Sequence, residues 1–166
     1  MSEISEAARV HIGLADVAIE DPAGKLNMLG GGVLGLGFDA QQGLTAPFTL
    51  IVEFYVSGAM TPTQFTAEIT LSGSDGKLVE LPGPTQPQVM RVAQIVDLEP
   101  PSIPGGASLA RKALDARAQI ILNFSNGLPL TPGTAYQWSV QIDGDEENRH
   151  DHRFAVMGSP TAPVIG

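Results

Sequence analysis

Two histidines in the last third of the sequence have the spacing of a metal site. His150 and His152 belong to the run DGDEENRHDHR at residues 143–153. Because side chains two apart on a β-strand share a face, the two imidazoles could chelate a transition metal. His11 completes the three histidines of the chain, and it would be a third ligand if the first and last strands pair. A small metal-binding protein or metalloenzyme built on these residues is therefore one hypothesis for the function.

The acidic half of the same run allows other interpretations. Asp143, Asp145 and Glu147 alternate as calcium ligands do, but the glycine and the closing glutamate of an EF-hand loop are missing. The simplest interpretation is a hairpin tip that carries solvated charges. A contact that depends on pH is a further alternative, because histidine titrates at about pH 6.5.

Residues 30–35 read GGGVLG, which has the G-x-G-x-x-G spacing of a dinucleotide-binding turn. That motif needs a helix that begins at the last glycine, since the helix N-terminus holds the pyrophosphate. Gly37, Gly43 and Pro47 follow instead, so the sequence predicts neither a helix nor a nucleotide site. We expect a strand with a tight bend, where glycine lets another backbone or an aromatic ring approach.

The apolar residues of this glycine-rich segment support a second interpretation. Val33, Leu34, Leu36 and Phe38 show no clean alternation with polar residues. Both faces of such a segment would be covered, and the covering element could belong to another subunit. These four residues are therefore the candidate contacts for a protein partner or for self-association.

The sequence offers little to a nucleophilic or cofactor-dependent enzyme. It has no cysteine and no G-x-S-x-G motif. Glu53 and Glu68 fall on the polar faces of predicted strands, where carboxylates often have no catalytic function. We expect a non-enzymatic protein without a cofactor.

The overall charge argues against several classes of partner. Nine basic and 18 acidic residues give a net charge of -9, and such a surface repels nucleic-acid phosphates and anionic lipid. No apolar run reaches the roughly 18 residues of a membrane span. The start, MSEISEAARV, lacks the basic and apolar regions of an export signal. Together with the absence of cysteine, this predicts a cytoplasmic location.

Apolar and polar residues alternate in segment after segment, which predicts short β-strands. Clear examples are FTLIVEFYV at 48–56, FTAEITL at 65–71, AQIILNF at 118–124 and YQWSVQI at 136–142. With VHIGLADVAI and KLNML near the start, about eight or nine strands are expected, as in a sandwich or barrel. One short helical crossover is expected within residues 99–116. The strands would form one domain over residues 1–158, followed by a flexible tail at 159–166.

Two short motifs resemble known families. LTPGTAY at residues 130–136 resembles the corner before the penultimate strand of fibronectin type III domains. This resemblance implies an immunoglobulin-like antiparallel β-sandwich in which the Tyr136 hydroxyl bonds back to the turn. It also implies that Leu130 is buried and that Trp138 faces the same core. GKLNMLGGG at residues 24–32 resembles the start of a family of small uncharacterised bacterial β-sandwich proteins, a resemblance that implies no activity.

These observations favour an interaction or structural module over the metal-binding hypothesis. Exposed sheet edges in a sandwich must be protected or used. We expect the chain to act through its sheet edges and its glycine-rich segment, within an assembly or on a protein partner.

Overall fold

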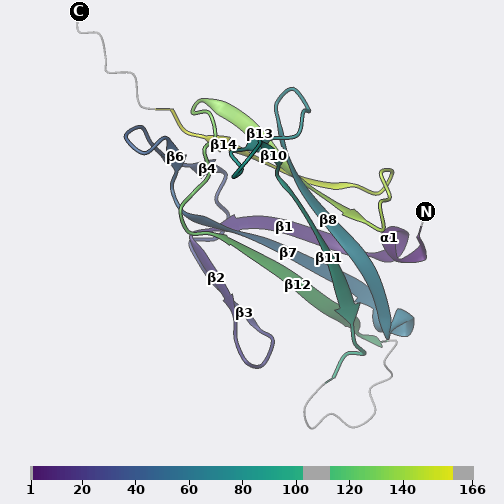
Figure 1. Cartoon of the computed structure of the whole chain (residues 1–166). Helices are drawn as coiled ribbons and strands as arrows, with labels where there is room; N and C mark the ends of the chain where they lie inside the picture. The colour runs from purple at the N-terminus through teal and green to yellow at the C-terminus, as the bar shows by residue number, and fades with distance from the viewer. Residues whose placement is uncertain (1, 103–112, 159–166) are drawn as a thin grey trace, which may run out of the picture.

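The computed structural model describes residues 2–102 and 113–158 (Figure 1). Most of the predicted helical crossover at 99–116 and all of the predicted tail at 159–166 lie outside the described residues. Within them the fold is all-β and is dominated by antiparallel sheets. No helix in the described residues combines the length and the hydropathy needed to cross a membrane.

Two sheets form the body of the molecule and pack against each other as layers (Figure 1). The three-stranded layer has the order β1 (Arg9–Ala15), β7 (Phe48–Ser57), β12 (Asp115–Phe124). The five-stranded layer has the order β11 (Arg91–Leu98), β8 (Thr63–Gly73), β13 (Thr134–Ile142), β14 (His150–Val156), β4 (Gly35–Leu36). Neighbouring strands are antiparallel except for β14 and β4, which pair in parallel over two residues.

Shorter elements surround the two layers. Three hairpins are made by β2 (Val17–Glu20) with β3 (Leu26–Leu29), β5 (Phe38–Asp39) with β6 (Leu44–Thr45), and β9 (Glu80–Leu81) with β10 (Gln88–Val89). A helix, α1 (Glu3–Ala7), precedes β1, and one 3₁₀ turn, η1 (Gly58–Met60), joins β7 to β8.

The segment VHIGLADVAI, expected to be one strand, is divided at Asp16 into β1 and β2. The N–H of Asp16 donates to the carbonyl of Gly30 at 3.3 Å rather than to the neighbouring strand β7. The chain therefore leaves the three-stranded layer at this point and enters the β2–β3 hairpin.

The shared core is built from the strand faces that the alternation predicts. Leu50, Val52 and Phe54 of β7 have no exposed surface, and neither has Ile69 of β8 or Trp138 of β13. Burial of such a side chain stabilises the fold by roughly 1.5–3 kcal/mol relative to its exposed state. The predicted phase of these strands is therefore correct, and it determines which residues face outward.

The corner motif forms the hydrogen bond that its resemblance implies. The hydroxyl of Tyr136 accepts the backbone N–H of Thr131 at 2.8 Å. Leu130 is buried in the turn, and Trp138 is buried two residues after the tyrosine. The motif thus fixes the start of β13 against the core.

Candidate interaction surface

Exposed large apolar side chains concentrate on one segment of the chain. Among the described residues, nine large apolar side chains are exposed, and five of them lie between positions 17 and 34. These five are Val17, Ile19, Met28, Leu29 and Leu34. Because contiguous exposed apolar residues mark interaction sites in soluble proteins, the segment is the strongest candidate surface.

The β2–β3 hairpin presents two different faces. Ala18 is buried against Ile51, on the side of β7 that points away from the shared core. Val17 pairs with Leu29 across the hairpin, and both share the opposite face with Ile19. These three side chains are 51%, 72% and 58% exposed respectively. We call Val17, Ile19 and Leu29 the hairpin face.

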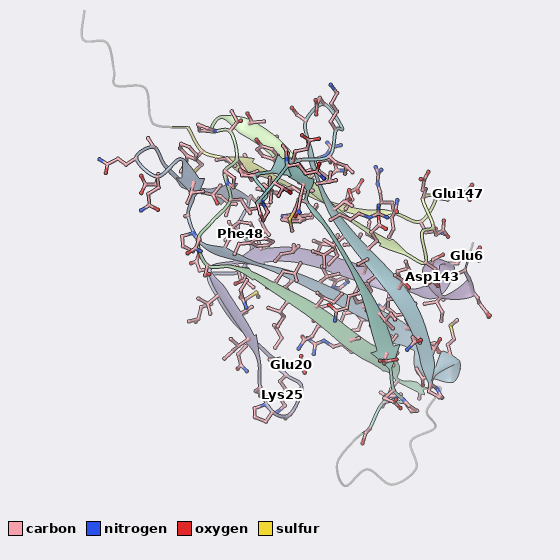
Figure 2. The ribbon with its side chains drawn as sticks, in the orientation of Figure 1. Glu6, Glu20, Lys25, Phe48, Asp143 and Glu147 are labelled. Atoms are coloured by element: carbon pink, nitrogen blue, oxygen red, sulfur yellow. The ribbon has the colours of Figure 1, made fainter. Side chains whose placement is uncertain are left out.

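The turn of the hairpin is held by one carboxylate and one guanidinium. Asp21 accepts the backbone N–H groups of Ala23 at 2.8 Å and Lys25 at 2.9 Å, and the bond from Lys25 is the main cause that lowers the pKa of Asp21. Arg117 on β12 donates through Nη1 to the carbonyl of Gly24 at 3.2 Å. The turn is therefore tied to the layer, although the hairpin itself projects from the body (Figure 1). Glu20 and Lys25 lie near its tip (Figure 2).

Arg117 also belongs to a polar cluster on the outer face of the three-stranded layer. Its Nε and Nη2 donate to Oε1 of Glu53 at 2.9 and 2.7 Å, and Nη2 donates to Oε1 of Gln119 at 2.5 Å. The Tyr55 hydroxyl donates to the same glutamate oxygen at 3.0 Å. Burial lowers the pKa of Arg117, but the hydrogen bond and charge of Glu53 outweigh it and leave that pKa raised. Glu53 is thus held in a structural ion pair with Arg117.

The glycine-rich segment runs from the hairpin to the other layer. The N–H of Val33 donates to the carbonyl of Leu14 on β1 at 3.2 Å. The N–H of Ala155 on β14 donates to the carbonyl of Leu34 at 2.9 Å. Residues 33–36 therefore bridge the two layers at the side where β1 and β14 lie, and their last two residues form β4.

The tight bend predicted for the glycines is present at Gly30. Its φ is 62°, and a Cβ on this residue would lie 2.1 Å from Oδ2 of Asp16. In the structure Gly35 begins a strand, and residues 31–47 contain no helix. The segment lacks the helix N-terminus on which a dinucleotide site depends.

Of the four apolar residues expected to contact a partner, only Leu34 is exposed in the structure. Leu34 is 67% exposed, whereas Leu36 is 3% exposed and belongs to the shared core. Val33 and Phe38 are half-buried and pack against the same core. Leu36 is therefore corrected from a contact residue to a core residue, because β4 turns its side chain between the layers.

The histidines do not converge on one site. His150 and His152 share one face of β14 with the buried Phe154, so their rings point to the inside of the two layers. The pairing of the first and last strands, on which His11 depended as a third ligand, is not formed, because β1 and β14 belong to different sheets. The pairing of β1 with β7 sets His11 opposite Glu53 on the outer face. In the described residues no group of three or more histidine, aspartate or glutamate side chains could hold a metal.

Within the described residues, the imidazoles of the two inward histidines do not form all the hydrogen bonds that they could. Their Nε2 atoms are buried without a hydrogen-bond partner in the described part of the chain. Burial lowers the pKa of His152, and burial lowers that of His150 more than the nearby charge of Asp151 raises it. Both imidazoles are therefore poorly suited to carry a proton in the folded state.

The acidic residues of the same run hold local structure. The Asp143 carboxylate accepts the N–H of Thr66 at 2.8 Å. Asp145 accepts hydrogen bonds from the hydroxyl of Ser5 in α1 and from Asn148, and these bonds lower its pKa to about 2. Glu6 of α1 lies at the same end of the molecule as Asp143 and Glu147 (Figure 2), and this end is therefore a structural junction.

Comparison with protein-family models and with curated proteins gives no match. The candidate surface therefore stands on geometry alone.

Local sequence patterns do not identify the hairpin face or the contacts of Arg117. Val17, Ala18 and Ile19 are all apolar, so the sequence does not say which face of this strand lies on the protein. The pairing of Arg117 with Glu53 depends on a register between strands far apart in the chain, which no local pattern contains.

Proposed function

We propose that this protein is a non-enzymatic interaction module that binds another protein through the β2–β3 hairpin and the adjoining Leu34. The observation that carries the proposal is the hairpin face, three large apolar side chains that are each more than half exposed. A two-stranded ribbon is marginally stable on its own in water. An apolar face exposed on such a ribbon has a cost that a bound partner removes.

We further propose that the scaffold is an immunoglobulin-like sandwich of the fibronectin type III kind. The order of the long strands supports this proposal, with the first, second and fifth in one layer and the third, fourth, sixth and seventh in the other. The corner tyrosine supports this proposal too, because Tyr136 lies near the start of the sixth long strand, β13, and its hydroxyl bonds back to the preceding turn. Such sandwiches host unrelated functions, so the fold itself does not select the partner.

Photo-crosslinking in the full chain tests the proposed function. A photoreactive residue in place of Ile19 is expected to give one discrete adduct in native cells. The matched control is the same residue in place of Ile95 on β11, which is 61% exposed but lies in a different sheet. Leu29→Asp is expected to abolish the Ile19 adduct while the denaturation midpoint stays near that of the parent protein. Equal adducts at both positions, or none at Ile19, would reject the proposal.

A further inference from the structure

The free edge of β3 is the part of the hairpin that has no neighbour. In the described residues β3 pairs only with β2. Within an antiparallel pair, alternate residues direct their backbone N–H and C=O groups away from the partner strand. An unpaired edge of this kind is a template for another strand.

The hairpin face is too small to hold a partner by apolar contact alone. A strand rises about 3.4 Å per residue and strands lie about 4.8 Å apart, so two four-residue strands present a face of roughly 130 Å². Stable protein interfaces bury about 800 Å² on each partner. Binding at this site therefore needs the backbone hydrogen bonds that an added strand would supply, as well as contact with the hairpin face.

The charges at the two ends of the hairpin favour a partner strand with basic ends over a second copy of this chain. Exposed Asp16 lies at the base, exposed Glu20 lies next to the turn, and Asp21 follows it. Lys25 is the one basic residue between positions 16 and 29, and the whole chain carries a net charge of -9. A second copy would bring the same excess of negative charge, whereas a strand with basic ends would meet complementary charge at both ends.

We propose that the edge of β3 takes up a β-strand of a partner protein, in which apolar residues alternate along one face and lysine or arginine flanks both ends. This inference rests on the proposed function and specifies its partner. The added strand extends the two-stranded ribbon to three strands. Its apolar residues continue the hairpin face formed by Val17, Ile19 and Leu29.

Synthetic peptides supply the probe for this proposal. The test peptide has the sequence Lys-Lys-Val-Thr-Val-Thr-Val-Lys-Lys, and the second has glutamate in place of every lysine. The third has every valine and threonine N-methylated, so that neither set of alternate residues can donate a backbone hydrogen bond. Amide resonances of ¹⁵N-labelled protein are followed during titration. The lysine peptide is expected to shift the amides of residues 26–29, and the other two peptides are expected to bind at least about tenfold more weakly. Raising the salt from 50 to 500 mM is expected to weaken binding of the lysine peptide, because added salt screens exposed charges.

Two variants of the protein complete the test. Leu29→Asp is expected to lose the lysine peptide, and Ile95→Asp, on the open edge strand β11, is expected to retain it. Shifts at β11 or β12 instead of β3, equal binding of the glutamate or N-methylated peptide, or no binding would overturn the proposal.

The outcomes separate this proposal from the proposed function. A crosslinked partner at Ile19 without peptide binding at β3 would leave the interaction module in place and reject strand addition. A dimer in sedimentation that Leu29→Asp dissociates would identify a second copy as the occupant and overturn the basic partner. Absence of both a crosslink and peptide binding would reject both proposals.

Discussion

The hydroxyl of Tyr136 bonds to the turn before β13. Its contribution to stability can be measured by removing that single oxygen atom. Tyr136→Phe removes the acceptor of the Thr131 N–H, and the tyrosine side chain is 8% exposed. Because this part-buried hydrogen bond is lost, the free energy of unfolding is expected to fall by about 1 kcal/mol in urea denaturation.

Tyr55→Phe is the matched control for this prediction. Its hydroxyl also makes one hydrogen bond, to Glu53, but the residue is half-buried and water can replace that partner. A loss at Tyr55 as large as that at Tyr136 would show that the corner bond has no special weight.

Gly30 is the second residue whose identity the backbone dictates. An alanine there would have to adopt the left-handed region, at φ 62°, and would place its Cβ against the carboxylate of Asp16. Gly32 has φ 77° but open space at the Cβ position, so Gly32→Ala should cost only the conformational term of roughly 1–2 kcal/mol. Gly30→Ala is expected to cost more than Gly32→Ala in the same denaturation experiment. Equal costs would mean that Asp16 moves aside freely.

At the scale of elements, the bridge at residues 33–36 combines an exposed and a buried leucine two positions apart. A carboxylate at 67% exposed Leu34 remains in water, whereas one at 3% exposed Leu36 would be buried in the shared core. Leu34→Asp is therefore expected to change the midpoint of unfolding little, and Leu36→Asp to lower the free energy of unfolding by several kcal/mol, at least about 3. A destabilised Leu34→Asp protein would contradict this assignment of the two faces.

The sequence predicts the elements better than it predicts their surroundings. The alternation in β7, β8 and β13 is strong because one face of each strand is apolar along most of its length. Residues such as Phe54 and Trp138 are therefore assigned to the core correctly. Leu36 was not, because β4 is two residues long and too short to show a period. Asp16 ends a strand through a bond to Gly30, and that contact depends on the path of the whole hairpin.

The candidate site was predictable only in part for the same reason. Leu34 was identified from its position in an apolar segment with little charge, and the structure exposes it. The hairpin face was missed because Val17 and Ile19 look like core residues of any alternating strand. The inward direction of His150 and His152 did have a local signal, since they continue the phase of Phe154 and Val156.

At the scale of the whole molecule, the two inward histidines lie between the layers at the side formed by β1 and β14, where residues 33–36 also run. On the neighbouring strand β13, His150 pairs with Val140 and His152 pairs with Trp138. Both partners have no exposed surface and no charge. The inward residues of β1 on this side are Val10 and Ile12, which pack against the core and do not titrate. Within the described residues, the charge of Asp151, next to His150, raises the pKa of that histidine, but burial lowers it more.

This arrangement predicts that the protein loses stability in mild acid. The pKa of both histidines is lowered from 6.5 in the folded state, so the unfolded chain binds more protons between the two values and stability rises with pH there. As pH falls below about 6.5, the free energy of unfolding should therefore decrease, until the pH is below the folded pKa. Asp145 acts in a separate pH range, because its contribution to the free energy of unfolding is lost as pH falls from 3.8 toward about 2.

Urea denaturation at pH 7.5 and 5.0 tests the prediction for the histidines. The His150→Gln/His152→Gln double variant should show a smaller difference in the free energy of unfolding between these two pH values. His11→Gln, on the outer face, is the control. A double variant with the same pH dependence as the parent protein would show that the inward histidines do not couple protonation to the packing of the two layers.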